Sequence, residues 1–230
     1  CCMNRLIVWD LDGTLVDTRP CIIKHIDHIT STLKCQDADL IRSEWLEMVG
    51  KPVKTIVAAC FVPRGVPFED ALAAYATADF EAIYSDVKPF FGAKQAAEYM
   101  RRFTRSAVAT SRTREQAKFI LKMTGMDQIF ATVVCIDDVS HPKPHPESLE
   151  LCSTANGVDP KDVLMIGDSP IDIAMANRFG CDSISVGYGF GDKCQLMGSR
   201  PTYYAGDTVA LSKALSEWWL RYGVFNDRGK

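Results

Sequence analysis

The sequence lacks the features that mark several classes of protein. No segment approaches the ~18 uninterrupted apolar residues that a membrane span needs. No run of lysine and arginine of the kind that follows a nucleic-acid backbone is present, and the formal net charge is only -3. No C-x-x-C pair occurs, which argues against the common zinc and dithiol patterns. We therefore expect neither a membrane protein nor a nucleic-acid-binding protein.

The nine cysteines do not indicate a disulfide framework. Their number is odd, and they are scattered through apolar segments, as around Cys60, Cys135, Cys152 and Cys181. Cysteines in this setting are typically small buried hydrophobes or free thiols of a reducing compartment. The first residues, Cys1–Arg5, lead directly into an apolar run and show no signal-peptide pattern. The sequence therefore predicts a cytoplasmic protein.

With 230 residues, the chain exceeds the usual domain size of ~100–200 residues, so we expect one large domain or a core with an insertion. Five short apolar runs rich in β-branched residues lack strict alternation, which is typical of buried parallel strands. Helix-like segments separate the later runs, and this alternation predicts an α/β fold with a three-layer parallel sheet. The strands are expected at residues 6–9, 106–110, 132–136, 163–166 and 183–186, and the helices at 114–123, 146–155 and 171–179.

The stretch from residue 19 to residue 88 interrupts this rhythm. Apolar residues recur there at helical spacing, as at Ile22 and Ile26, and no strand candidate occurs among them. The sequence therefore predicts two domains. Residues 1–18 and 89–230 form the α/β core, and residues 19–88 form an all-helical domain of three or four helices.

Polar residues gather at the carboxyl ends of the predicted strands, where open α/β sheets bind their ligands. Each one alone has a plain structural explanation, such as a turn or a helix cap. Carboxylates, hydroxyls and a lysine that follow separate strands are harder to explain as independent accidents. The set consists of Asp10 and Asp12 after the first strand, Thr110 and Ser111 after the second, Lys143 after the third, and Asp168 and Asp172 after the fourth.

In their order and spacing, these residues resemble the haloacid dehalogenase superfamily of phosphotransferases. The matching motifs are D-x-D-G-T at residues 10–14, Thr110, the pair Lys143-Pro144, and G-D-S-x-x-D at residues 167–172. The helical insertion resembles the cap of the subgroup that contains phosphoglycolate phosphatases and β-phosphoglucomutases. The resemblance covers essentially the whole chain and implies a Rossmann-like, three-layer parallel-sheet core with an inserted all-helical cap domain.

Several carboxylates close together raise one another's pKa unless a cation compensates their charge. Oxygen ligands with room for water and a substrate phosphate suit Mg²⁺. The resemblance assigns the metal ligands to the Asp10 carboxylate, the backbone carbonyl of Asp12, and Asp168, and it leaves Asp172 to orient neighbouring groups. Mg²⁺ is therefore the expected cofactor.

The resemblance also implies a reaction in two displacements. Asp10 would attack phosphorus and form an aspartyl-phosphate, which water then hydrolyses. Asp12 would act as general acid and then as general base, and Thr14 would brace the turn that carries both aspartates. The phosphate oxygens would be held by the Thr110 hydroxyl, the Ser111 backbone amide and Lys143.

The expected activity is hydrolysis of a small phosphomonoester, because family members that act on carbon–halogen or carbon–phosphorus bonds lack an aspartate where Asp12 stands. Phosphoglycolate is the first substrate to consider. The nearest alternative is a phosphomutase of the β-phosphoglucomutase type, although D-G-T-L here differs from the D-G-V-I more common in those mutases. A non-catalytic receiver-like phosphoacceptor is a distant alternative, because receivers are shorter and have no cap. We expect a small phosphorylated metabolite as partner, and a monomer or homodimer.

Two further residues are candidate substrate contacts. Lys51 lies in the stretch GKPVKT, which resembles the cap loop that faces the core site in related enzymes, and Arg112 directly follows the Thr110-Ser111 pair. The glycines of VGYGFGD at residues 186–192 lack the full G-x-G-x-x-G spacing and an immediately following helix. We therefore expect a loop at the mouth of the site there, not a nucleotide-binding loop.

Overall fold

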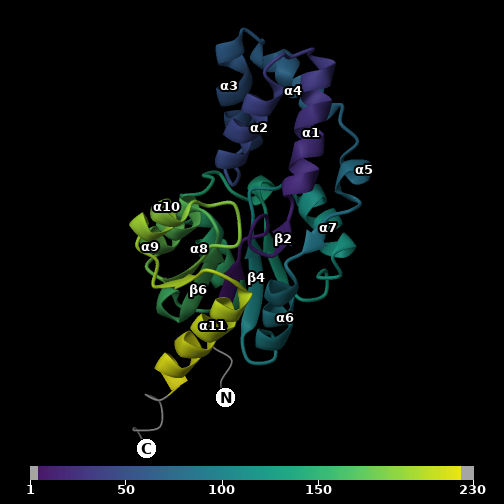
Figure 1. Ribbon diagram of the computed structural model, residues 1–230. Helices are drawn as coiled ribbons and strands as arrows, with labels where there is room; N and C mark the ends of the chain where they lie inside the picture. Colours follow the sequence, from purple (N-terminus) through teal and green to yellow (C-terminus); the bar gives the residue numbers. More distant parts are fainter. Residues whose placement is uncertain (1–4, 224–230) are drawn as a thin grey trace, which may run out of the picture.

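A six-stranded parallel sheet forms the centre of the larger part of the molecule in the computed structural model (Figure 1). The structure describes residues 5–223, so residues 1–4, on which the signal-peptide expectation depends, and residues 224–230 lie outside the described part. The strands are β1 (Leu6–Trp9), β4 (Arg105–Ala109), β5 (Thr132–Val134), β6 (Val163–Gly167), β7 (Asp182–Val186) and β8 (Tyr203–Ala205). Their order is β5-β4-β1-β6-β7-β8 and all neighbours are parallel, which confirms the predicted α/β fold.

Helices cover both faces of this sheet and complete the three layers. Along β1, Ile7 and Trp9 belong to one hydrophobic cluster, and Leu6 and Val8 belong to a second cluster on the opposite face. The first cluster contains residues of α6 (Phe91–Met100), α7 (Arg114–Met123) and α11 (Thr208–Gly223), and the second contains residues of α8 (Glu147–Asn156) and α9 (Pro170–Phe179). A short helix, α10 (Lys193–Gly198), follows β7, and 3₁₀ helices occupy Ile136–Asp138 and Pro160–Asp162.

All five strands expected from the sequence are present, with bounds within two residues of the prediction. The sixth strand, β8, is an addition that pairs with β7 through Tyr203, Tyr204 and Ala205. The sequence gives no signal for β8, because three residues after a proline and a threonine do not form an apolar run. The three helices predicted between the later strands are also present, as α7, α8 and α9.

The helical insertion begins and ends beside a small antiparallel ribbon. In this ribbon β2 (Val16–Asp17) pairs with β3 (Lys88–Pro89), where the chain leaves the sheet domain and returns to it. Five α-helices lie between them, one more than the three or four expected: α1 (Arg19–Thr32), α2 (Ala38–Glu47), α3 (Val53–Phe61), α4 (Phe68–Ala76) and α5 (Phe80–Tyr84), with a 3₁₀ helix at Val62–Arg64.

The first four of these helices pack around a hydrophobic cluster of their own. Ile26, Ile41, Val57 and Ala71, one from each helix, are fully buried in it. α5 differs, because its Tyr84 belongs to the first cluster of the sheet domain. Figure 1 accordingly shows α1 to α4 as a bundle beyond one end of the sheet. The exact residues that divide core from cap stay a prediction.

No helix within residues 5–223 combines the length and the apolar content that crossing a membrane would require. Every cysteine in the same range is a free thiol.

Candidate active site

Asp10 lies at the centre of the site, directly after β1. Along the chain, β4 and β5 are added on one side of β1, and β6, β7 and β8 are then added on its other side. The direction of strand order therefore reverses beside β1. Ligands of open α/β sheets bind at such a reversal, outside the carboxyl ends of the strands. Thr110 follows β4 and Asp168 follows β6, so the two strands beside β1 bring all three side chains to the same edge.

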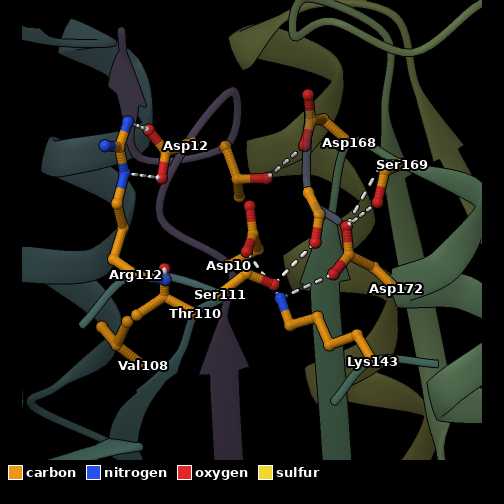
Figure 2. Close-up of polar contacts among 12 residues, drawn as sticks. Asp10, Asp12, Val108, Thr110, Ser111, Arg112, Lys143, Asp168, Ser169 and Asp172 are labelled. Atoms are coloured by element: carbon orange, nitrogen blue, oxygen red, sulfur yellow. Dashed lines mark hydrogen bonds and ion pairs between the residues drawn. The ribbon is translucent and has the colours of Figure 1, made fainter. Parts of the chain in front are cut away.

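Lys143 joins two of the aspartates in a buried cluster (Figure 2). Its Nζ donates to Asp10 Oδ1 at 2.6 Å and to Asp172 Oδ1 at 2.8 Å. Burial alone would lower the pKa of this lysine, but the two carboxylates outweigh burial and raise it. The ammonium group is therefore charged. The same burial raises the pKa of Asp10 to about 7, with Lys143 opposing the rise and Asp172 adding to it.

Hydrogen bonds at the start of α9 orient the Asp172 carboxylate. The backbone N–H and the hydroxyl of Ser169 both donate to Asp172 Oδ2. Ser169 is the N-cap of α9, with Pro170 at the first helical position, so the pair forms a capping box. The carboxylate of Asp172 thus satisfies the helix terminus with one oxygen and Lys143 with the other.

Asp168 is the third carboxylate of the cluster, and within residues 5–223 no lysine or arginine forms an ion pair with it. Its Oδ2 accepts the backbone N–H of Phe190 at 2.7 Å, and its Oδ1 lies 3.5 Å from the Thr14 hydroxyl. Burial, followed by the charges of Asp10 and Asp172, raises its pKa well above the usual range. One oxygen from each of these aspartates lies within 4.8 Å of the others. Three buried carboxylates, of which only two contact Lys143, form a set of hard oxygen donors that fits a divalent cation.

Two glycines allow the chain to close tightly around Asp168. Gly13 has a φ of +79°, and a Cβ added there would lie 2.0 Å from Asp168 Oδ2. A Cβ added at Gly189 would lie 2.3 Å from the carbonyl oxygen of Gly13. The loop 186–192 therefore packs directly on the aspartate turn, and Tyr188 donates from its hydroxyl to the Thr14 carbonyl at 3.0 Å. The sequence placed this loop at the mouth of the site but gave no sign of its bond to Asp168.

Asp12 is held by an arginine rather than facing the cluster (Figure 2). Arg112 donates from Nε to Asp12 Oδ2 at 3.0 Å and from Nη2 to Oδ1 at 2.8 Å. The Thr18 hydroxyl donates to the same Oδ1 at 2.6 Å. Burial alone would raise the pKa of Asp12, but the arginine outweighs it and holds that pKa below its usual value. Arg112 also donates to the Tyr84 hydroxyl at 2.9 Å, so α5 contributes to this pairing.

The loop after β4 connects the core to the helical domain. Thr110 is buried, and its Oγ1 accepts the backbone N–H of Arg112 at 3.2 Å. The Ser111 hydroxyl donates to the carbonyl of Gly50 at 2.6 Å, in the loop before α3. Lys51, the next residue of that loop, is exposed. The expected cap loop therefore meets the core beside the strand-end residues.

A cavity of ≈60 Å³ lies between the sheet domain and the helical bundle. Its core side carries the predicted site residues Asp10, Asp12, Thr110, Ser111 and Arg112, and Lys51 lies at its helical side. Aromatic and aliphatic side chains supply most of the remaining wall. These include Ile22, His25, Trp45, Ile56, Tyr75 and Tyr84.

The predicted residues thus fall into two adjoining groups. Asp10, Lys143, Asp168 and Asp172 form the buried cluster, with Thr14 at its edge, while the others surround the cavity. Sequence reasoning missed Thr18 and Tyr84 as partners of the second group. No short-range pattern could have identified Tyr84, because it lies 28 residues from the arginine that it contacts.

Fold and site together define an α/β enzyme whose chemistry centres on buried carboxylates at the carboxyl end of a parallel sheet. Residues 7–186 match the model of the haloacid dehalogenase-like hydrolases, so the chain belongs to this family. The family resemblance predicted from the motifs is confirmed, and so is the prediction of an enzyme of the phosphatase type.

Curated relatives cover nearly the whole chain. It is 27% identical to the pyrophosphatase PpaX of Oceanobacillus iheyensis over 214 residues, which are 88% of this chain and 92% of the relative. It is 30% identical to the probable phosphatase IndB of Dickeya dadantii over 211 residues, 86% of this chain and 88% of the relative.

Solved structures share the fold at lower identity. A predicted phosphoglycolate phosphatase from Haemophilus somnus superimposes with a TM-score of 0.81 at 20% identity, covering 92% of this chain and 97% of the other. A protein from Thermotoga maritima described as a candidate β-phosphoglucomutase gives a TM-score of 0.74 at 20% identity, covering 93% and 99%.

Proposed function

We propose that the chain is a Mg²⁺-dependent phosphatase that hydrolyses a small phosphomonoester through an aspartyl-phosphate on Asp10. The observation that carries the proposal is the position of the Asp10 carboxylate. It lies at the carboxyl end of the central strand, it is bonded to the buried Lys143, and it faces the same cavity as Asp12 and Thr110. A nucleophile, an acid–base group and phosphate-binding donors around one space are the parts that phosphoryl transfer requires.

In the first displacement, a carboxylate oxygen of Asp10 attacks phosphorus, and the bond from phosphorus to the ester oxygen breaks. Asp12 gives its proton to the leaving alkoxide, so an alcohol departs and the phosphoryl group stays on Asp10. General acid–base help of this kind typically accelerates a reaction by ~10²–10⁴-fold. Lys143, the Thr110 hydroxyl and the Ser111 amide bind the non-bridging oxygens, over which the negative charge of the transferred group is spread.

In the second displacement, water attacks the phosphorus of the aspartyl-phosphate. Asp12, now a carboxylate, takes a proton from this water, and the bond between phosphorus and the Asp10 oxygen breaks. Inorganic phosphate leaves, and both aspartates return to their starting states. The low pKa that Arg112 imposes on Asp12 suits this base role, whereas the acid role requires the pairing with Arg112 to loosen first.

Mg²⁺ would be held by the carboxylates of Asp10 and Asp168 and by the backbone carbonyl of Asp12. When bound, it supplies positive charge that offsets the buried carboxylates and the substrate phosphate. The donor set supports this choice, since it consists of oxygen atoms and contains an aspartate without a cation. Asp172 would keep Lys143 directed at Asp10.

Phosphoglycolate is the first substrate to test, because its carboxylate would suit the exposed Lys51 at the helical side of the cavity. A phosphomutase of the β-phosphoglucomutase type is the second candidate function, favoured by the small cavity between core and helices. The receiver-like alternative loses support, since the family match spans residues 7–186 and includes the insertion.

Rapid quench in acid with a radiolabelled phosphomonoester tests the proposal and separates the two candidates. A phosphatase gives a labelled protein that forms and decays within each turnover while inorganic phosphate is released. A mutase keeps its label much longer, releases little phosphate, and is strongly activated by a sugar bisphosphate. Absence of any labelled protein during fast turnover would rule out the aspartyl-phosphate.

A further inference from the structure

We propose that His141, His145 and Glu147 form a binding site for Zn²⁺ on the surface loop that carries Lys143. One ligand atom from each of the three side chains lies within 4.8 Å of the others. Two imidazoles and one carboxylate are a ligand set that proteins use for zinc, with water in the fourth position. The site is separate from the buried aspartate cluster, and the inference does not depend on the proposed function.

The two histidines lie together although the sequence between them excludes a helix. A helix would align two residues that are four positions apart, but Pro142, Pro144 and Pro146 rule one out here. The structure nevertheless brings the two ring centroids to 4.5 Å, with an angle of 30° between the ring planes. The backbone N–H of His145 donates to the Pro142 carbonyl at 3.0 Å, and this turn produces the approach. Because the prolines fix their φ angles, the loop loses little freedom when an ion binds.

Glu147 is held in place as the oxygen ligand. Its Oε1 accepts the backbone N–H of Ser140 at 2.8 Å, and its Oε2 accepts the backbone N–H of His141 at 2.8 Å. The hydrogen bond from Ser140, helped by those from His141, lowers the pKa of Glu147. Each oxygen of a carboxylate has a second lone pair, so these bonds leave the ionised group able to bind a metal.

The spacing of His141 and Glu147 is close to that of two ligands of one ion. His141 Nδ1 lies 3.0 Å from Glu147 Oε2. Two ligands of a tetrahedral ion with bonds of ~2.0 Å are about 3.3 Å apart. The backbone N–H of Glu147 donates to His145 Nδ1 at 3.3 Å, a long contact that this nitrogen can exchange for a metal. The His141 side chain is 66% exposed, so its ring can rotate to complete the coordination.

The donor types at the two sites select different ions. Imidazole nitrogens suit zinc, copper and nickel, whereas Mg²⁺ prefers ligands that are all oxygen. The buried aspartate cluster offers oxygen atoms alone, and the loop offers two rings and one carboxylate. We therefore expect the loop to bind Zn²⁺ even when Mg²⁺ is in excess.

An ion at this site would join the chain on both sides of Lys143. His141 and His145 each lie two residues from this lysine. Lys143 itself points inward, and its Nζ donates to Asp10 and Asp172. Zn²⁺ would thus restrain the loop that presents the lysine to the aspartate cluster.

Nuclear magnetic resonance of the imidazole nitrogens tests the assignment, because the chain has 4 histidines and each gives its own signals. Zn²⁺ is titrated into the full chain labelled with nitrogen-15, with Mg²⁺ in excess. We expect the ring signals of His141 and His145 to shift together and to saturate, while those of His25 and His28 stay in place. A titration in which the His141 and His145 signals do not both shift and saturate at micromolar Zn²⁺ overturns the inference.

Variants of the loop assign the zinc to its ligands by isothermal titration calorimetry. His145→Phe and Glu147→Gln should each weaken this binding event at least tenfold, since even a group that only orients a metal ligand contributes about 10–100-fold. Circular dichroism checks that both variants are folded. Persistence of the event at full affinity in either variant contradicts the site.

Two control variants exclude other ligands. Cys194→Ser removes an exposed free thiol, and Asp168→Asn alters the buried aspartate cluster. Both should keep the zinc binding event that the loop variants weaken. Its loss in either control would assign the zinc to the thiol or to the aspartates and overturn the inference.

Discussion

Arg112 holds Asp12 by two hydrogen bonds, of 3.0 Å and 2.8 Å, although the two residues lie 100 positions apart in the chain. The side chains of both are only 12% exposed. Breaking a buried ion pair by removing one partner leaves the other charge without compensation. The pair therefore couples the stability of the fold to a residue proposed for acid–base catalysis.

Replacing Arg112 by methionine should lower the free energy of unfolding by about 3 kcal/mol at neutral pH, because Asp12 then remains charged and buried without its partner. In an Asp12→Asn background, the same replacement should cost less than about 1 kcal/mol. Urea denaturation of the four proteins in this double-mutant cycle measures the coupling. Additive effects would show that the two side chains act independently.

The control for this cycle is Lys24→Met. Lys24 pairs with Asp86 at 3.3 Å, but these side chains are 51% and 76% exposed. Loss of such a surface pair should cost less than about 1 kcal/mol. A cost similar to that of Arg112→Met would mean that burial does not set the strength of the Arg112 pair.

Asp10→Asn should abolish turnover and leave the fold intact, because it removes the nucleophile with almost no change in volume. No labelled protein should appear after acid quench, and the circular dichroism spectrum should match that of the wild type. Asp17→Asn is the matched control, since Asp17 belongs to β2 and contacts Arg19 instead of the cluster. Turnover near the wild-type rate in Asp10→Asn would refute the assignment of the nucleophile.

The strand ends could be predicted from the sequence because local signals define them. A buried strand followed at once by a carboxylate or a hydroxyl is visible around Asp10, Thr110 and Asp168, and the parallel sheet then brings such ends together. The partners of these residues could not be predicted in the same way. Phe190 donates to Asp168 through its backbone N–H, so the identity of its side chain carries no information about the bond.

Arg112 illustrates a second limit. Its position after Thr110 suggested a substrate contact, but the structure pairs its guanidinium with Asp12 and Tyr84. The acceptor that Arg112 contacts depends on how α5 and the cap pack against the core. No local sequence pattern contains that information. β8 was missed for a related reason, because its pairing with β7 and not its composition makes it a strand.

Removal and return of Mg²⁺ should change the stability of the protein measurably. Asp168 has a pKa well above its usual range when no cation is bound. At pH values above the pKa that this aspartate has in the unfolded chain, its raised pKa therefore destabilises the folded state. A bound cation relieves this repulsion. At a Mg²⁺ concentration of 100 times Kd, the gain is about 2.7 kcal/mol. Thermal melting with a chelator and with Mg²⁺ measures it.

Asp168→Asn should behave in the opposite way. The variant should be at least as stable as the wild type in chelator, because the repulsion is gone, and it should gain little from Mg²⁺. Asp159→Asn, an exposed aspartate before the 3₁₀ helix at Pro160–Asp162, should keep the full response to Mg²⁺. A full Mg²⁺ response in Asp168→Asn would exclude this residue as a ligand.

His25 should make the protein less stable in mild acid. Its pKa falls from 6.5 to about 4 on folding, chiefly through burial. Between these two values the unfolded chain binds a proton that the folded protein does not bind, so stability decreases as the pH falls from 6.5 towards 4. At pH 5 the loss attributable to this residue is about 2 kcal/mol relative to pH 7.5. Urea denaturation at the two pH values measures this loss in the wild type and in His25→Phe, in which that part of the loss should disappear.

His145→Phe is the control for this prediction. His145 is an exposed histidine before α8, so this variant should retain the whole loss. An unchanged pH dependence in His25→Phe would show that His25 does not stay neutral in the fold.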